Sequence, residues 1–255
     1  MAERMPSLFV GHGAPLLALD ASLGEPLRRL GEELPRPRGI LAVSAHWEDS
    51  PLTLGTTEPR ELIYDFSGFP EALYRVRYPA PGAPWLADRV IGLLKDRAPM
   101  RSQRGLDHGV WTPLLHLYPT ADVPLLQISM PRSDSSSELF ELGRALAPLR
   151  DEGVLILGTG NVTHNLRKLD WQEDAATPQW AKEFDLWIAD VLAQRNWEAL
   201  VDYQRRAPHL ALAQPTDDHL RPLLVAAGAG SDGPVSFPIV GWEYGSLSRR
   251  SVQFG

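Results

Sequence analysis

The chain has 255 residues, contains no cysteine and carries a formal net charge of −7 at pH 7. The absence of cysteine excludes disulfides, thiolate metal ligands, iron–sulfur clusters and a cysteine nucleophile. The acidic balance argues against nucleic acid or an anionic membrane surface as a partner. The N-terminus lacks the apolar segment of a signal peptide, and no stretch reaches the length of a membrane-spanning helix. We therefore expect a cytoplasmic protein, for which a cysteine-free composition is suitable.

In the first half of the chain, short apolar runs alternate with segments of helical periodicity. The run at 8–10 predicts a buried strand that ends at Gly11-His12-Gly13, where glycine permits backbone conformations closed to other residues. A helix is expected to start near Pro26, because proline is favoured in the first helical turn. The next expected elements are a strand at 39–44, a short strand at 52–55, a helical turn at 71–74, a helix at 84–95, a loop at 105–109 and a helix at 110–118.

The second half continues the alternation of strand and helix. A strand is expected at 123–129, and Ser135 with Glu138 forms the capping-box pattern that opens a helix. The apolar run at 153–158 is the clearest strand of the chain. The remaining expected elements are a helix from Thr177-Pro178 to about 194, a helix capped by residues 215–219 that ends near Gly228 and Gly230, and closing strands at 235–240 and 251–254.

This order of elements predicts an α/β fold. Strands that are apolar on both faces and alternate with helices indicate a mostly parallel or mixed central sheet, covered by helices on both faces. No linker, repeat or low-complexity segment interrupts residues 1–255, so we expect a single domain. In open sheets of this kind, ligands bind at the C-terminal edge of the strands.

Histidines gather where the expected strands end. His12, His46 and His164 come just past the C-terminal ends of three expected strands, His108 lies in a glycine-flanked loop, and His219 follows two aspartates at an expected helix start. Taken singly, a histidine is more often a surface or hydrogen-bonded structural residue. Their joint placement leads us to expect that all five converge at one edge of the sheet.

The chemistry suited to such a cluster is metal binding. Imidazole ligands without thiolates suit zinc, iron, copper or nickel. The His-Glu-x-x-His motif, the P-loop and the Gly-x-Ser-x-Gly elbow are absent from the sequence. Gly158 and Gly160 begin a dinucleotide-binding fingerprint, but Thr163 stands where its third glycine is required. Nucleotide binding is therefore not expected.

Six motifs occur in order along the chain, and together they carry a family resemblance. They are Gly-His-Gly-Ala-Pro at 11–15, Ser-Ala-His-Trp at 44–47, Tyr-Asp-Phe-Ser-Gly-Phe-Pro at 64–70, Asp-His-Gly at 107–109, Gly-Thr-Gly-Asn-Val-Thr-His-Asn at 158–165 and Pro-Thr-Asp-Asp-His at 215–219. The chain resembles the class III extradiol ring-cleavage dioxygenases of the LigB-like superfamily, and most closely their 4,5-DOPA dioxygenase branch, over residues 5–255. The resemblance implies cleavage of a DOPA-like catechol with O2 at a mononuclear non-haem metal site.

The resemblance also implies roles for individual residues. His164 matches the catalytic acid/base, and His108 matches a second active-site histidine that contacts substrate or oxygen. One divalent metal per chain is implied, with Fe(II) for activity. Zn(II) is expected in purified protein because it binds such ligands more tightly. The family's three metal ligands are matched by His12, His46 and His219, with Asp218 as the alternative third ligand.

Residues beside the histidines are expected to complete the site. Trp47, Phe66 and Phe69 are expected to line the pocket for the aromatic ring, although packing in the core explains each of them equally well. Asp65 and Asp217 are expected to orient imidazole rings. Taken by themselves, the two adjacent aspartates before His219 are also explained as an N-cap with favourable charge at a helix start.

Two other functions stay open from the sequence. Three histidines and a water also make a catalytic zinc site, so a zinc-dependent hydrolase with His164 as base is one alternative. The other is a non-enzymatic binding protein of the same fold, although the presence of both His108 and His164 argues against it. The catechol and the oligomeric state also stay open. The cations nearest to the motifs, Arg167 and Arg221, are better explained as surface residues than as a clamp for a substrate carboxylate.

Overall fold

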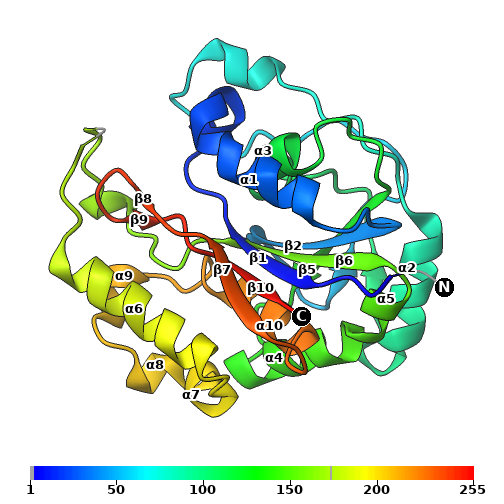
Figure 1. Ribbon diagram of the computed structural model, residues 1–255. Helices are drawn as coiled ribbons and strands as arrows, with labels where there is room; N and C mark the ends of the chain where they lie inside the picture. Colours follow the sequence, from blue (N-terminus) through cyan, green and yellow to red (C-terminus); the bar gives the residue numbers. More distant parts are fainter. Residues whose placement is uncertain (1–2, 173) are drawn as a thin grey trace.

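The computed structural model describes residues 3–172 and 174–255 (Figure 1). Its strands are β1 (Ser7–Gly11), β2 (Gly39–Glu48), β3 (Thr53–Leu54), β4 (Met100–Arg101), β5 (Leu125–Met130), β6 (Val154–Gly160), β7 (Val235–Ile239), β8 (Trp242–Glu243), β9 (Leu247–Ser248) and β10 (Ser251–Phe254). Eight of them form one sheet in the order β4-β3-β5-β2-β6-β1-β10-β7, and β8 pairs with β9 separately.

The sheet is parallel at its centre and mixed at its sides. Strands β5, β2, β6 and β1 run parallel to one another. Strand β10 is antiparallel to both β1 and β7, and β3 is antiparallel to β5. The register places Gly11 of β1 beside Gly160 of β6, so the segments leaving these two strands emerge at the same edge. The α/β prediction is confirmed, including its mixed sheet.

Helices cover both faces of the sheet (Figure 1). One face carries α1 (Ala21–Glu33) and α3 (His108–Leu117), and the other carries α2 (Pro84–Leu93), α4 (Ser136–Leu146), α6 (Gln179–Ala193) and α10 (Arg221–Ala229). The shorter helices are α5 (Pro148–Asp151), α7 (Trp197–Val201), α8 (Tyr203–Arg206), α9 (Leu210–Ala213) and the single turns η1 (Pro15–Leu19), η2 (Glu71–Arg75), η3 (Lys95–Arg97) and η4 (Leu166–Lys168). Among the described residues, none of the helices has the length and apolarity needed to cross a membrane.

Each face of the sheet packs against one apolar core. On β2, Leu41 and Val43 point into the core beneath α4 and α10, whereas Ile40 and Ala42 point into the core beneath α1 and α3. Successive side chains of a strand face opposite sides, so a strand covered on both faces must be apolar throughout. Truncating the buried Leu41 to alanine is expected to cost about 2–5 kcal/mol of stability.

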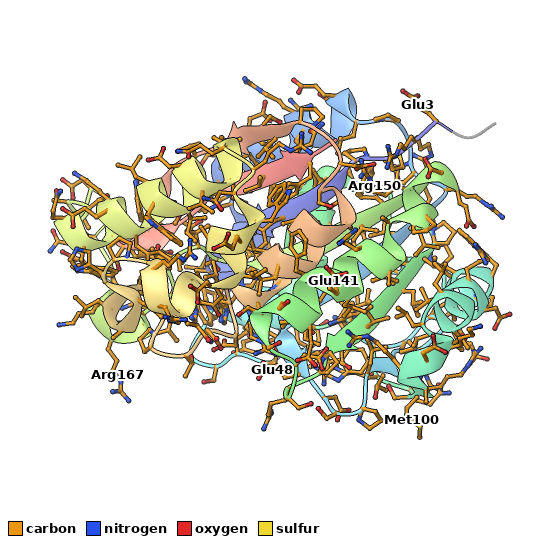
Figure 2. All side chains as sticks on the ribbon, turned by 90° about the horizontal axis from the view of Figure 1, so that it is seen from below. Glu3, Glu48, Met100, Glu141, Arg150 and Arg167 are labelled. Carbon is orange, nitrogen blue, oxygen red and sulfur yellow. The ribbon has the colours of Figure 1, made fainter. Side chains whose placement is uncertain are left out.

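The edge of the sheet opposite the histidines is held by a buried arginine. Arg150, labelled in Figure 2, donates hydrogen bonds to the backbone oxygens of Met5, Ala229 and Phe254. These three residues belong to the start of the chain, the end of α10 and the end of β10. The bonds tie the segments together where the central strands begin.

The first helix starts earlier than its sequence pattern predicts. Helix α1 begins at Ala21 and contains Pro26, rather than starting near it. The reason is Asp20, whose carboxylate accepts hydrogen bonds from the backbone N–H groups of Ser22 at 2.8 Å and Leu23 at 3.0 Å. This N-cap satisfies two free donors of the first turn and sets the helix start.

Three other boundaries differ from expectation near the site. Strand β2 continues to Glu48, so His46 lies within a strand rather than after one. Helix α3 begins at His108, so this residue is not in a loop. Helix α10 begins at Arg221 behind Leu220, with no side-chain cap, so the expected aspartate N-cap is wrong. For α3 a long-range contact replaces the local pattern, because the backbone N–H of His108 donates to the carboxylate of Asp65 at 3.1 Å.

Candidate active site

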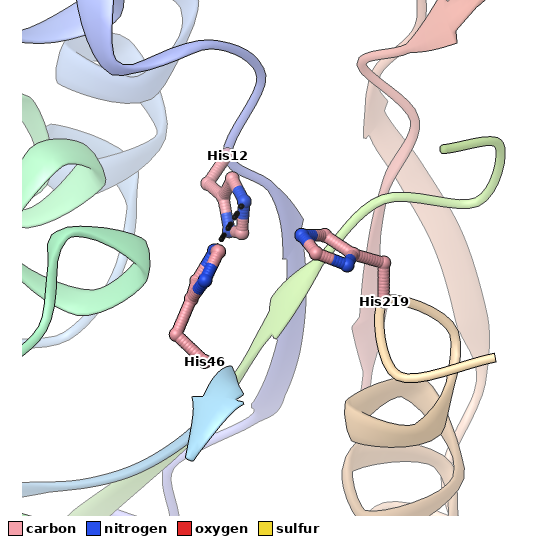
Figure 3. A group of neighbouring side chains, drawn as sticks. All are labelled: His12, His46 and His219. Atoms are coloured by element: carbon pink, nitrogen blue, oxygen red, sulfur yellow. Dashed lines mark hydrogen bonds between the residues drawn. The ribbon is translucent and has the colours of Figure 1, made fainter. Parts of the chain in front are cut away.

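Three imidazoles from distant parts of the chain meet at the C-terminal edge of the sheet (Figure 3). His12 follows β1, His46 lies in β2, and His219 precedes α10. The Nε2 atoms of His12 and His46 are 3.4 Å apart, and one ligand atom from each of the three residues lies within 4.8 Å of the others. Ligands about 2 Å from a tetrahedral ion lie about 3.3 Å apart, so this spacing is suitable for one ion.

The hydrogen-bonding state of His219 supports the same interpretation. Its Nδ1 is hydrogen-bonded to the carboxylate of Asp218, whereas its Nε2 is buried without a hydrogen-bond partner among the described residues. Leaving a buried polar atom unpaired costs about 1–3 kcal/mol, a cost that an ion bound at Nε2 relieves. A carboxylate behind a histidine ligand fixes the ring and its tautomer. The three histidines therefore fit a divalent metal, with Asp218 placed behind His219.

The turn that carries His12 is held by a buried ion pair. Glu243 accepts a hydrogen bond from the backbone N–H of Ala14 at 3.1 Å and pairs with Arg249 at 2.6 Å. Gly13 has φ +63°, and a Cβ atom there would lie only 2.4 Å from Oε1 of Glu243. Only glycine fits this left-handed, crowded position. The contributions of Glu243 and Arg249 were missed in the sequence because they lie more than 225 residues away in the chain.

Asp65 joins His46 and His108. Its Oδ1 accepts the backbone N–H of His108 at 3.1 Å and the ring Nδ1 of the same residue at 2.8 Å, and its Oδ2 lies 3.5 Å from Nδ1 of His46. Although burial acts in the opposite direction, the hydrogen bonds from His108 lower the pKa of Asp65. The ionised carboxylate is therefore placed to orient both imidazoles, and this role of Asp65 stays a prediction.

His164 packs flat against His219. Their ring centroids are 3.4 Å apart and their planes differ by 8°. The loop that carries His164 is pinned by Asn161, which donates to the Ser248 oxygen at 2.9 Å, and by Thr163, which donates to the Ser246 oxygen at 2.7 Å. His164 thus has a defined position although it lies beyond the end of β6.

Burial keeps His12, His46 and His164 uncharged. Desolvation and the neighbouring His219 lower the pKa of His164 to about 3. Desolvation, followed by the surrounding histidines, holds the pKa of His12 and of His46 well below the usual value. Because metal ligands must be deprotonated, a neutral state at pH 7 prepares His12 and His46 for an ion.

All five of these histidines line one cavity of about 850 Å³. Phe66 and Phe69 stand in its wall, with their rings edge to face at a centroid distance of 5.5 Å. The sequence prediction missed several other wall residues, because apolar residues in irregular loops have no periodicity that separates them from ordinary packing. These residues are Leu16, Leu166, Leu169, Trp171 and Leu247.

Two expected site residues lie elsewhere. Trp47 does not line the cavity, since it follows His46 on β2 and faces the opposite side of the strand, where the guanidinium of Arg104 lies 5.2 Å from its ring. Asp217 accepts hydrogen bonds from Tyr203 at 2.6 Å and Gln204 at 2.9 Å, rather than from an imidazole. These contacts hold it against helix α8 instead of beside the metal group.

Comparisons with known proteins agree with this geometry. The family model described as "Catalytic LigB subunit of aromatic ring-opening dioxygenase" matches residues 19–255. An Escherichia coli K12 protein named "4,5-DOPA dioxygenase extradiol" is 42% identical, covering 100% of this chain and 96% of the relative. A Beta vulgaris protein of the same name is 38% identical, covering 97% of this chain and 96% of the relative.

A solved crystal structure has the same fold. It is that of an uncharacterized protein from Escherichia coli K12, 37% identical, with a TM-score of 0.85 over 99% of this chain and 100% of the other. The family match spans most of the chain, and the resemblance inferred from the six motifs is confirmed. The chain belongs to the LigB family and is an aromatic ring-opening dioxygenase of the extradiol type.

Proposed function

We propose that this enzyme cleaves the ring of a catechol at one Fe(II) ion held by His12, His46 and His219. The observation that supports the proposal is the meeting of these imidazoles at the floor of an apolar cavity, where His12 and His219 each have a buried nitrogen without a hydrogen-bond partner among the described residues. Relatives named "4,5-DOPA dioxygenase extradiol" support a catechol as the substrate class. We propose further that residues 1–255 form a single catalytic domain.

Imidazole ligands suit this chemistry because, unlike carboxylate ligands, they add no negative charge. When bound, a divalent ion would stabilise deprotonated catechol oxygens by its charge, and Fe(II) would also supply the redox chemistry with O2. Because His12 and His46 are uncharged at pH 7, they leave the charge of an ion undiminished. Zn(II) competes well for imidazole ligands, so purified protein is expected to carry zinc unless it is loaded with iron.

His164 is proposed to move the protons. Its pKa of about 3 leaves the ring neutral at pH 7, with a lone pair free to accept a proton from a catechol hydroxyl. The same low pKa makes the imidazolium, once formed, a strong acid that returns its proton later in the reaction. The stack on His219 holds this ring beside the catechol oxygens that the metal group would bind.

His108 is proposed to hydrogen-bond substrate or oxygen. Its Nδ1 donates to the ionised Asp65, which leaves Nε2 as a hydrogen-bond acceptor. The ring also lines the cavity, 4.0 Å from the ring of His46 between centroids. Phe66 and Phe69 would then pack against the catechol ring and exclude water from it.

Oxygen uptake tests the proposal. Protein reconstituted with Fe(II) under anaerobic conditions and then mixed with aerated catechol should consume O2 and form a yellow ring-opened product. A zinc-dependent hydrolase would consume no O2 with any catechol. A metal-replete sample that leaves O2 unchanged across simple, alkyl-substituted and carboxylated catechols would therefore refute ring cleavage.

A further inference from the structure

The cavity above the histidines is walled by apolar side chains. Leu166 and Trp171 stand in its wall with 62% and 59% of their surfaces exposed, which is unusual for large apolar residues of a folded protein. Trp171 also packs against Tyr244, with ring centroids 4.6 Å apart. Exposed apolar side chains grouped at a cavity are typical of a surface that a ligand covers.

Among the described residues, the cavity wall contains no lysine or arginine that could pair with a charged group on the substrate's ring. Among the described residues that line it, Asp65 alone carries a permanent charge, and its two oxygens already face His108 and His46. A carboxylate on the substrate would thus find no lysine or arginine in the described wall.

The arginines nearest to the site face elsewhere. Arg167 follows Leu166 in the chain but points outward from the molecule (Figure 2). Arg221 is buried, donates to the backbone oxygens of Pro131 and Asp134, and pairs with Glu48 at 3.1 Å. Neither of them lines the cavity, so the two cations that the sequence placed nearest to the motifs do not supply a carboxylate clamp.

We propose that the substrate's ring substituent is uncharged and apolar, such as an alkyl or aryl chain, and that Leu166, Leu169 and Trp171 hold it. The inference rests on the proposed catechol cleavage and narrows its substrate class. A carboxylate entering this wall loses hydration without gaining a partner, whereas each buried methylene contributes favourably. DOPA, which carries both an ammonium and a carboxylate, should therefore be a poor substrate for this enzyme.

A matched pair of catechols tests the inference by binding alone. Isothermal titration calorimetry would use protein loaded with Zn(II), which has no redox chemistry of its own. The probes are 4-butylcatechol and 3-(3,4-dihydroxyphenyl)propanoate, which have side chains of similar length and differ in the terminal charge. We expect 4-butylcatechol to bind with a Kd at least about tenfold lower. Equal binding, or tighter binding of the carboxylate, would overturn the inference.

Two exposed leucines provide a matched comparison. Leu166 lines the cavity, whereas Leu186, with 56% of its surface exposed on α6, does not. Leu166→Ala should raise the Kd of 4-butylcatechol several-fold, on the scale of the lost methylenes, and Leu186→Ala should leave it unchanged. Arg167→Ala should leave the Kd of the carboxylated catechol unchanged. Equal effects at the two leucines, or a selective loss of carboxylate binding in Arg167→Ala, would count against the proposal.

The two proposals fail in different ways. The ratio of the Kd values of 4-butylcatechol and the carboxylated catechol depends only on the cavity wall. It decides whether the wall prefers an apolar or a charged ring substituent. Oxygen uptake by Fe(II)-loaded protein with the same two compounds decides ring cleavage. A protein that binds 4-butylcatechol preferentially but consumes no O2 with either compound would support the wall inference and refute the proposed reaction.

Discussion

His164 and His219 form a parallel stack, with ring centroids 3.4 Å apart and an angle of 8° between the ring planes. The stack joins a residue proposed to transfer protons to a residue proposed to hold the metal. His219 also contributes, after burial, to the low pKa of His164. The stack orients the His164 ring, and burial together with the neighbouring His219 keeps it neutral, which a proton acceptor requires.

Replacing His164 should remove proton transfer without removing the metal. We expect His164→Gln to retain stoichiometric metal and a normal circular dichroism spectrum, while kcat falls roughly 10²–10⁴-fold, as is usual for loss of a general acid–base. Metal content by mass spectrometry and initial rates of O2 uptake measure the two effects. Turnover within a few-fold of the wild type would show that another group carries the proton.

His209 provides the matched control for this variant. It lies on the surface, hydrogen-bonded to Glu183, and does not line the cavity. Its φ of +56° is a left-handed conformation that asparagine tolerates well. We expect His209→Asn to keep the wild-type kcat. The loss in His164→Gln would then come from the place of His164 in the cavity, because removing a surface histidine has no such effect.

The third metal ligand is decided by comparing two neighbouring residues. With Asp218 hydrogen-bonded to Nδ1 of His219, we expect His219→Ala to lose stoichiometric metal. Asp218→Asn should retain it with an affinity about 10–100-fold weaker, as expected when a carboxylate behind a histidine ligand is removed. Competition titrations with a chelator measure both. The reverse outcome would identify Asp218 as the ligand.

Local signals made much of the fold predictable. The apolar run at 251–254 coincides with β10, and the Ser135–Glu138 capping box opens α4 as expected. Signals of this kind depend on residues within a few positions of each other. At these two places no long-range contact overrides them, so the predicted elements form. The start of α1 was misplaced because the Asp20 cap outweighs the preference of Pro26 for a first turn.

The site was only partly predictable, because its wall and its support are made by long-range contacts. The five histidines could be found, since each stands beside a glycine, a strand end or a helix start. Trp47 was misplaced because β2 runs on past Ser44, and the alternation of the strand turns this side chain away from the cavity. The Glu243–Arg249 pair beneath Gly13 has no motif in the sequence that would identify it.

The turn at His12 can be tested with two glycines of similar conformation. Gly13 and Gly68 have φ of +63° and +79°, but a Cβ would clash with Glu243 only at Gly13 and would meet no atom within 4 Å at Gly68. We expect Gly68→Ala to lower the free energy of unfolding by about 1 kcal/mol, from backbone strain alone. Gly13→Ala should lower it by more and also weaken metal binding, since the turn carries His12.

Urea denaturation of the metal-free variants and chelator titrations give the two quantities. The difference between the glycines isolates the contact with Glu243, because the conformational penalty is common to both. Equal destabilisation with unchanged metal affinity would mean that the turn tolerates a side chain and that Glu243 has no part in placing His12.

The buried histidines should make the metal-free protein sensitive to mild acid. His164 has a pKa of about 3 when folded against 6.5 ordinarily, so below pH 6.5 the unfolded chain binds a proton that the folded chain does not. The free energy of unfolding must then fall as the pH drops, by up to about 1.4 kcal/mol per pH unit for each such group. The lowered pKa values of His12 and His46 act in the same direction. The carboxyl of Asp65, whose pKa lies below the ordinary 3.8, titrates only in stronger acid.

We therefore expect the wild type to lose stability steeply between pH 7 and pH 5, and His164→Gln to lose it less steeply, because one of the three groups is gone. Urea denaturation of the metal-free proteins at several pH values within this window measures both slopes. The comparison depends on the difference between the variants, so other titrating groups common to both cancel. Identical slopes would mean that His164 binds its proton equally well in the folded and unfolded chains, which its burial against His219 makes unfavourable.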